Sequence, residues 1–220
     1  MKKAIIFDCD GTLVDSEHLT ALAYTDVIRP YGIDLTPATL HEEFIGLTNR
    51  TISQLLSERY GIALPVDEVM HGFEAAMSAG MREHMRVLPE SIACFKALLG
   101  QHPVAVASNG NRRTVIEELK VGGYYDLIGE DRIFTANQVA HPKPAPDLFL
   151  LAASHLGADP KTCVVIEDSA PGARAGFAAG MDVVGYIGLA HDPVLSEKRL
   201  RDAGCVHVIN SLADLPGLVA

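Results

Sequence analysis

The sequence predicts an α/β protein built on a mostly parallel sheet, with a helical segment inserted near its start. One observation is a series of short apolar runs, too short for helices, that alternate with helical patterns. The other is a stretch from about residue 15 to residue 87 with helical periodicity and no strand-like run. Strands that alternate with helices indicate βαβ units, whose strands run parallel.

The first predicted strand is Ala4–Phe7, because its β-branched residues favour a buried strand and Asp8 ends the run. Similar runs predict further strands at Val104–Ala107, Ile133–Thr135, Cys163–Ile166, Val183–Tyr186 and Val206–Ile209. Helical patterns between them predict helices at Arg113–Leu119, Asp147–Leu156, Ala170–Ala179 and Leu195–Ala203.

The segment 15–87 carries apolar residues at helix spacing, with prolines and glycines near the expected helix ends. Its methionines, from Met70 to Met85, favour packing over a substrate-facing surface, since methionine readily fills cores. We therefore expect a core formed by residues 1–14 and 88–220, with residues 15–87 as a helical insert.

Composition and net charge limit the classes of partner that this protein is expected to bind. The 220 residues hold 18 Lys+Arg against 28 Asp+Glu, a net charge of -10, which argues against nucleic acid or an anionic membrane as a partner. No apolar stretch approaches the length of a membrane span. The 4 cysteines have no metal-binding spacing and favour buried thiols in a reducing cytoplasm. We expect a cytoplasmic monomer, with a weak dimer as the alternative.

Polar residues follow the predicted strands, where ligands of parallel sheets bind. Asp8 and Asp10 leave the first strand on the same side, and Gly11 permits a sharp turn that exposes amide groups. One carboxylate can attack phosphorus while the other transfers protons. Taken alone, the pair is equally compatible with a solvated loop or a helix cap.

Two further strand ends offer groups that bind an anion. Ser108 precedes a helix and can hold an anion together with helix amides, although a simple helix cap is the alternative. Asn109 lies close enough in sequence to line the same pocket. Pro142 and Pro144 fix the backbone around Lys143, whose ammonium suits a phosphoryl group unless it is merely solvated.

Glu167 and Asp168 follow the fourth apolar run. They would repel each other and Asp8 unless a cation lay between them. Oxygen ligands that meet a phosphate favour Mg²⁺.

Together these motifs resemble one family. FDCDGTLVDSE, ASNGN, KPAPDLF and VVIEDSAPGARAG are similar to the haloacid dehalogenase superfamily, in its phosphatase and β-phosphoglucomutase-like branch. The resemblance spans the chain and implies a Rossmann-like core with a helical cap inserted after the first motif.

The resemblance also implies roles. It makes Asp8 the nucleophile and a Mg²⁺ ligand, and Asp10 the general acid/base with its carbonyl on the metal. The remaining candidates are phosphate or substrate binders (Gly11, Ser108, Asn109, Lys143 and, in the cap, Arg50) and metal partners (Asp168 and Glu167). Arg50 ends Gly46–Arg50, which resembles a loop that faces the core site; it would grip a second anion or be merely solvated.

The implied function is a Mg²⁺-dependent phosphatase that acts on a small phosphorylated metabolite, such as a sugar phosphate or sugar-acid phosphate. A β-phosphoglucomutase-like mutase is the first alternative, although Thr20 stands where the mutase pattern has a histidine. A non-catalytic ligand-binding protein is the second alternative, but its expected sign, a broken motif, is missing from the sequence.

Overall fold

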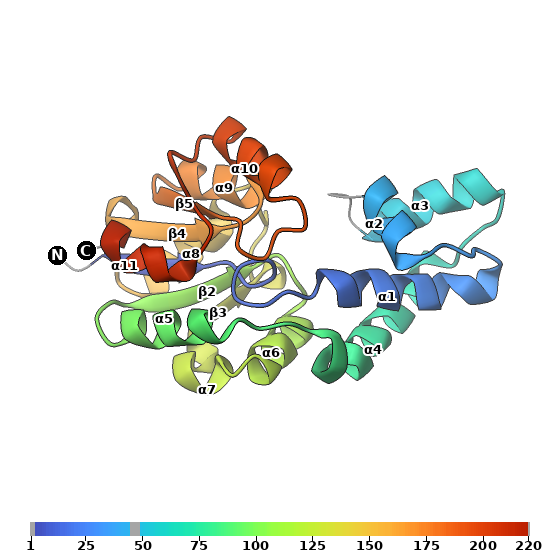
Figure 1. Cartoon of the computed structure of the whole chain (residues 1–220), viewed down its shortest axis with the longest axis horizontal. Coiled ribbons are helices and arrows are strands. Elements are labelled where there is room, and N and C mark those ends of the chain that lie inside the picture. Colours follow the sequence, from blue (N-terminus) through green and yellow to red (C-terminus); the bar gives the residue numbers. More distant parts are fainter. Residues whose placement is uncertain (1–2, 45–48, 220) are drawn as a thin grey trace. The chain divides into compact units, whose positions relative to one another are not determined.

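The computed structural model describes residues 3–44 and 49–219. The chain divides into two compact units, and each is described by itself (Figure 1). The core unit comprises Met1–Asp15 and Arg86–Ala220, and the inserted unit comprises Ser16–Met85.

The core unit contains a six-stranded sheet in the order β3-β2-β1-β4-β5-β6, and each pair of neighbouring strands is parallel. The strands are β1 (Ala4–Phe7), β2 (Val104–Ser108), β3 (Ile133–Thr135), β4 (Cys163–Glu167), β5 (Asp182–Tyr186) and β6 (His207–Ile209). The predicted α/β class with a parallel sheet is confirmed. The strand order is that of Rossmann-like folds, which change direction between β1 and β4 and bind ligands at the carboxyl ends there.

Helices cover both faces of this sheet (Figure 1). On one face, Leu148 and Phe149 of α8 and Ala173 of α9 pack against strand residues such as Ile6. On the other face, the ring of Phe7 lies 5.3 Å from that of Phe95 in α5. Because successive side chains of a strand point to opposite faces, both faces of β1 are apolar. This explains why the central strands are apolar runs without polar alternation.

The helices of the core unit follow or precede these strands. They are α5 (Pro89–Leu99), α6 (Arg112–Val121), α7 (Tyr125–Ile128), α8 (Asp147–His155), α9 (Ala170–Ala178), α10 (Pro193–Asp202) and α11 (Leu215–Val219). Short 3₁₀ helices of the core unit lie at Glu130–Arg132, Ala136–Gln138, Pro160–Thr162 and Leu212–Asp214. Side chains cap several of the α-helices: Asn111 caps α6, Ser169 caps α9 and Asp192 caps α10.

The described residues of the inserted unit form helices joined by short connections, with no strand among them. The unit contains α1 (Glu17–Ile28), α2 (Pro37–Phe44), α3 (Asn49–Tyr60) and α4 (Val66–His84), with a 3₁₀ turn at Arg29–Tyr31. α1 packs against α4 and α2, and residues such as Tyr24, Ile28 and Leu56 form a separate core. Met77 and Met81 are buried, in agreement with the predicted packing role.

The two crossings between the units are hydrogen-bonded to each other. Asp15 N–H donates to the Arg86 carbonyl at 2.9 Å, and Arg86 N–H donates to the Asp15 carbonyl at 3.0 Å. A guanidinium nitrogen of Arg86 also lies 3.4 Å from Asp15 Oδ2. The inserted unit therefore begins and ends at one antiparallel bridge. Across the described part of the chain, none of the helices is long and apolar enough to span a membrane.

Candidate active site

Three of the candidate residues lie at the carboxyl ends of three adjacent strands. Asp8 follows β1, Ser108 is the last residue of β2, and Glu167 is the last residue of β4. β1 pairs with both of the other strands, and Asp8 N–H continues the ladder by donating to the Ile166 carbonyl at 2.9 Å. The parallel sheet therefore brings these three polar positions to one edge, at the reversal of strand order.

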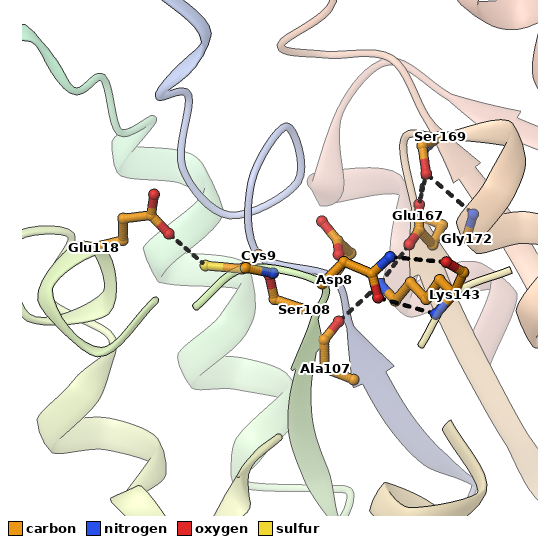
Figure 2. A network of polar contacts seen from close by, with 11 residues as sticks. Asp8, Cys9, Ala107, Ser108, Glu118, Lys143, Glu167, Ser169 and Gly172 are labelled. Atoms are coloured by element: carbon orange, nitrogen blue, oxygen red, sulfur yellow. Dashed lines mark hydrogen bonds and ion pairs between the residues drawn. The ribbon is translucent and has the colours of Figure 1, made fainter. Parts of the chain in front are cut away.

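Lys143 crosses this edge with its ammonium buried among acceptors. Its Nζ donates to Asp8 Oδ1 at 2.6 Å, to Glu167 Oε1 at 2.6 Å and to the Ala107 carbonyl at 2.8 Å (Figure 2). Burial alone lowers the pKa of Lys143, but the two carboxylates outweigh it and hold the pKa above its ordinary value. Lys143 is therefore a fixed cation against Asp8.

Glu167 is held from two sides. Its other oxygen, Oε2, accepts from the Ser169 N–H at 3.0 Å and the Ser169 hydroxyl at 2.8 Å (Figure 2). A Cβ on Gly172 would overlap this carboxylate, so glycine makes room for it at the start of α9. The sequence predicts Glu167 as a further metal partner; the structure places its two oxygens on Lys143 and Ser169.

The acidic groups at this edge repel one another. Burial is the main cause that raises the pKa of Asp8 to about 8; Lys143 lowers it, while Glu167 and Asp10 raise it. Burial, followed by Glu167, Asp8 and Asp10, raises the pKa of Asp168 well above its ordinary value. A cation among these oxygens would relieve the repulsion. Hard oxygen donors with excess negative charge are the ligands that Mg²⁺ prefers, so the donor set fits Mg²⁺.

The turn after β1 needs glycine at position 11. Gly11 has φ +81°, and a Cβ there would overlap the Asp168 carboxylate. Its N–H donates to the Val14 carbonyl at 2.7 Å, which closes the turn. Asp10 lies at this turn and is exposed, whereas Asp8 is buried. The two carboxyl groups thus occupy different environments.

The side chains of Ser108 and Asn109, at the end of β2, have different hydrogen-bond partners. The buried Ser108 hydroxyl accepts from Gly110 N–H at 3.0 Å, which leaves its own hydrogen to donate to a bound anion. The side chain of Asn109 donates to the Lys143 carbonyl at 2.9 Å and accepts from the Lys143 N–H at 3.0 Å. The structure therefore places both polar atoms of Asn109 on the main chain of Lys143, in the loop of residues 139–146, here called the lysine loop.

Arg50 belongs to the inserted unit. In the first turn of α3 its Nη2 lies 2.9 Å from Asp67 Oδ1, and both side chains are largely exposed. Residues 46–48 of the predicted substrate loop lie outside the described residues.

The sequence motifs do not predict three features of the site. The Ala107 carbonyl is a main-chain group, for which side-chain identity offers no signal. Ser169 holds Glu167 and caps α9; a serine directly before the Ala–Pro–Gly start of a helix is a signal for the cap, although not for the carboxylate contact. Cys9 points away from Lys143, and its thiol donates to the buried Glu118 carboxylate at 3.7 Å (Figure 2).

Comparisons with known proteins agree with this architecture. A family model for haloacid dehalogenase-like hydrolases matches residues 2–180. The chain is 28% identical to a 6-phosphogluconate phosphatase of Escherichia coli (strain K12), an alignment that covers 98% of this chain and 94% of the relative. It is 31% identical to hexitol phosphatase A of the same organism, with 90% of this chain and 89% of the relative covered.

A similar solved structure contains bound ions. A haloacid dehalogenase family hydrolase from Deinococcus radiodurans R1, determined with bound phosphate and sodium, is 31% identical, with a TM-score of 0.79. The match covers 100% of this chain and 95% of that one. The family model extends over most of the chain and includes the carboxyl ends of β1, β2 and β4. The chain therefore belongs to the haloacid dehalogenase-like hydrolase family.

Proposed function

We propose that this chain is a Mg²⁺-dependent phosphatase that hydrolyses small phosphorylated metabolites through an aspartyl-phosphate at Asp8. The contact of Lys143 with Asp8 at the carboxyl edge of the sheet carries the proposal. A carboxylate with a fixed cation beside it has an arrangement suited to receive a phosphoryl group, since phosphoryl transfer depends mainly on position and charge stabilisation.

The reaction has two half-reactions. In the first, an oxygen of Asp8 forms a bond to phosphorus as the bond to the ester oxygen breaks, and Asp10 gives its proton to that leaving oxygen. In the second, Asp10 takes a proton from water, whose oxygen attacks phosphorus and releases inorganic phosphate and Asp8. The exposure of Asp10 supports this role, because a proton carrier must reach both leaving group and water.

The other groups of the site balance the charge on the phosphoryl oxygens. The Lys143 ammonium, the Ser108 hydroxyl and the amide groups of the Gly11 turn are suited to this task. Mg²⁺, when bound, would be held by the carboxylates of Asp8 and Asp168 and the main-chain carbonyl of Asp10, and would supply further charge neutralisation. Glu167 would serve this arrangement chiefly through Lys143, since its oxygens contact Lys143 and Ser169.

Small carbohydrate phosphates are the proposed substrates. The named activities of the relatives, a 6-phosphogluconate phosphatase and a hexitol phosphatase, support a sugar phosphate or a sugar-acid phosphate. We assign the inserted helical unit to the role of a cap that selects the substrate. Arg50 is its candidate ligand for a second anionic group, in competition with Asp67.

The phosphatase is favoured over a mutase by the first helix of the inserted unit. The hydroxyl of Thr20, at the position where the mutase pattern has a histidine, lies 3.8 Å from Met77 Sδ. A threonine cannot act as the general base that an imidazole provides near neutral pH.

Phosphate release from a panel of metabolite monoesters tests the proposal. The wild-type enzyme with Mg²⁺ should release phosphate in step with substrate loss, and Asp8→Asn should reduce the rate at least about 10³-fold. Asp202→Asn, at an exposed aspartate of α10, is the matched control and should retain the wild-type rate. Retained turnover in Asp8→Asn would contradict the mechanism. An isomerised sugar phosphate without phosphate release would identify a mutase instead.

A further inference from the structure

The side chain of Asn109 joins two loops of the core unit. Asn109 directly follows the last residue of β2, and Lys143 lies 34 residues later in the chain, beyond β3. The amide accepts from the Lys143 N–H at 3.0 Å and donates to the Lys143 carbonyl at 2.9 Å. Two opposed bonds to one residue fix both the position and the orientation of its main chain.

Apart from the bonds to Asn109, few main-chain hydrogen bonds among the described residues fix the lysine loop. Pro142, Pro144 and Pro146 have no N–H group, and the segment between the 3₁₀ turn Ala136–Gln138 and α8 contains no strand or α-helix. Ala145 N–H donates to the Pro142 carbonyl at 3.0 Å, a bond within the loop itself. The link from this loop to the sheet edge through Lys143's main chain is therefore Asn109.

The position of the Lys143 main chain matters because all three hydrogens of the ammonium are already used in hydrogen bonds. A lysine ammonium has three donors, and Asp8, Glu167 and the Ala107 carbonyl accept one each. The side chain is 3% exposed, and its Nζ also lies 4.7 Å from the centre of the Phe149 ring. A shift of the loop would therefore break these short contacts and move the cation away from Asp8.

We propose that Asn109 is a positioning residue that acts through Lys143: it holds the ammonium against Asp8 and does not itself bind the phosphoryl group. This inference rests on the proposed function, because it needs Lys143 to take part in the reaction. It also replaces the role of substrate ligand that the sequence predicts for Asn109.

A double-mutant cycle tests the functional part. Asn109→Ala should lower kcat about 10-fold or more in the wild-type background and less than about 2-fold in a Lys143→Met background, because its action requires the ammonium. Equal fold losses in both backgrounds would show that Asn109 acts independently of Lys143 and would overturn the inference. If neither the wild type nor Lys143→Met turns over any phosphate ester, the proposed function itself fails, which is a different outcome.

Amide hydrogen exchange tests the structural part without using activity. Because three of the five residues from Pro142 to Pro146 are prolines, Lys143 and Ala145 carry the amide hydrogens of this stretch. Asn109→Ala should accelerate exchange at Lys143, whereas Asn109→Asp keeps an acceptor and should protect it more than Ala does. Unchanged exchange in Asn109→Ala would overturn the inference, even if Lys143→Met fails to fold.

Asn111→Ala is the matched control for both experiments. Asn111 lies in the same loop, and its side chain accepts from Arg113 N–H at 2.9 Å as the cap of α6. Its loss removes a similar side-chain to main-chain bond with no contact to Lys143. It should leave kcat and the exchange of the Lys143 amide unchanged; a loss equal to that of Asn109→Ala would reduce the effect to general loop stability and overturn the proposal.

Discussion

Lys143 Nζ lies 2.6 Å from Asp8 Oδ1, although 135 residues separate the two in the sequence. The same nitrogen lies 2.6 Å from Glu167 Oε1, and all three side chains are almost completely buried. A buried cation between two carboxylates combines a structural and a functional role.

Replacement of Lys143 by methionine should weaken both folding and catalysis. Met has a similar volume, but it leaves Asp8 and Glu167 buried without a cation, which costs about 3–5 kcal/mol when one partner of such a pair is lost. We expect kcat to fall about 10²–10³-fold, since the proposed mechanism loses the cation that balances charge on the phosphoryl oxygens. Urea unfolding and steady-state kinetics measure the two effects.

The control is Lys161→Met, which changes an exposed lysine. It should shift stability by no more than about 0.5 kcal/mol and leave kcat unchanged. A Lys143→Met protein as stable as the wild type would show that the buried carboxylates do not depend on the lysine.

Gly172→Ala should disturb the site through Glu167. Alanine is favoured over glycine in a helix by about 0.5–1 kcal/mol, but its methyl group would overlap the Glu167 carboxylate. The overlap should dominate, with a net loss of about 1–3 kcal/mol and a lower kcat, because Glu167 supports Lys143. Gly217→Ala provides the comparison, since a Cβ there meets nothing within 4 Å. Equal stability and activity in both variants would exclude a close packing role for Gly172.

Removal of metal should separate the wild type from Asp168→Asn. Without Mg²⁺, the variant should be the more stable protein, because it lacks a partly buried carboxyl that is desolvated and that neighbouring carboxylates repel. With saturating Mg²⁺, the wild type should gain about 2.7 kcal/mol at 100 times the Kd, and the variant little.

Thermal unfolding with a chelator and with Mg²⁺ measures this reversal, with Asp202→Asn as a control that should follow the wild type in both conditions. A wild-type Tm that does not respond to Mg²⁺ would argue against a metal at Asp8 and Asp168. Phosphatase activity should disappear with the chelator and return with added Mg²⁺.

Tyr124 makes stability sensitive to alkaline pH. Its hydroxyl donates to the Leu13 carbonyl at 3.1 Å. Burial, together with Cys9, Tyr186 and Cys94, raises its pKa above the ordinary value of about 10, while Ser91 opposes the rise. Because the folded-state pKa is the higher one, the contribution to stability is complete below about pH 10 and is lost as pH rises further.

Tyr124→Phe should therefore cost about 1 kcal/mol near neutral pH, through the lost hydrogen bond, and lose less stability than the wild type between about pH 8 and pH 10.5. Urea unfolding midpoints at both pH values provide the measurement. Some alkaline sensitivity should remain in the variant, because burial also raises the pKa of Tyr24 and Tyr186. An identical pH dependence in the two proteins would contradict the assignment.

The strands could be predicted closely because parallel strands buried on both faces are continuous apolar runs. β1 and β3 have the predicted bounds, while β2 and β4 each extend one residue further, to Ser108 and Glu167. A rule that ends strands at polar residues misses these two, since their hydrogen bonds permit burial at 4% and 1% exposure. The helix Pro89–Leu99 was not among the predicted elements.

The convergence of the site residues could also be predicted, because parallel strands present their carboxyl ends at one edge. The individual contacts between these side chains could not be predicted. Spacing does not show that Asn109 turns to the Lys143 main chain, or that Arg50 meets Asp67, because side-chain direction depends on loops whose course the sequence pattern does not determine.

The pairing of Asp15 with Arg86 has an evolutionary consequence. Because the two ends of the inserted unit are hydrogen-bonded neighbours, a segment of any length between them leaves the strand order and the positions of Asp8 and Lys143 unchanged. Such an insertion point lets one module be exchanged, enlarged or reduced to a short turn while the other keeps its chemistry. If the two units have the proposed roles, substrate selectivity and bond cleavage are free to diverge at separate rates within one chain.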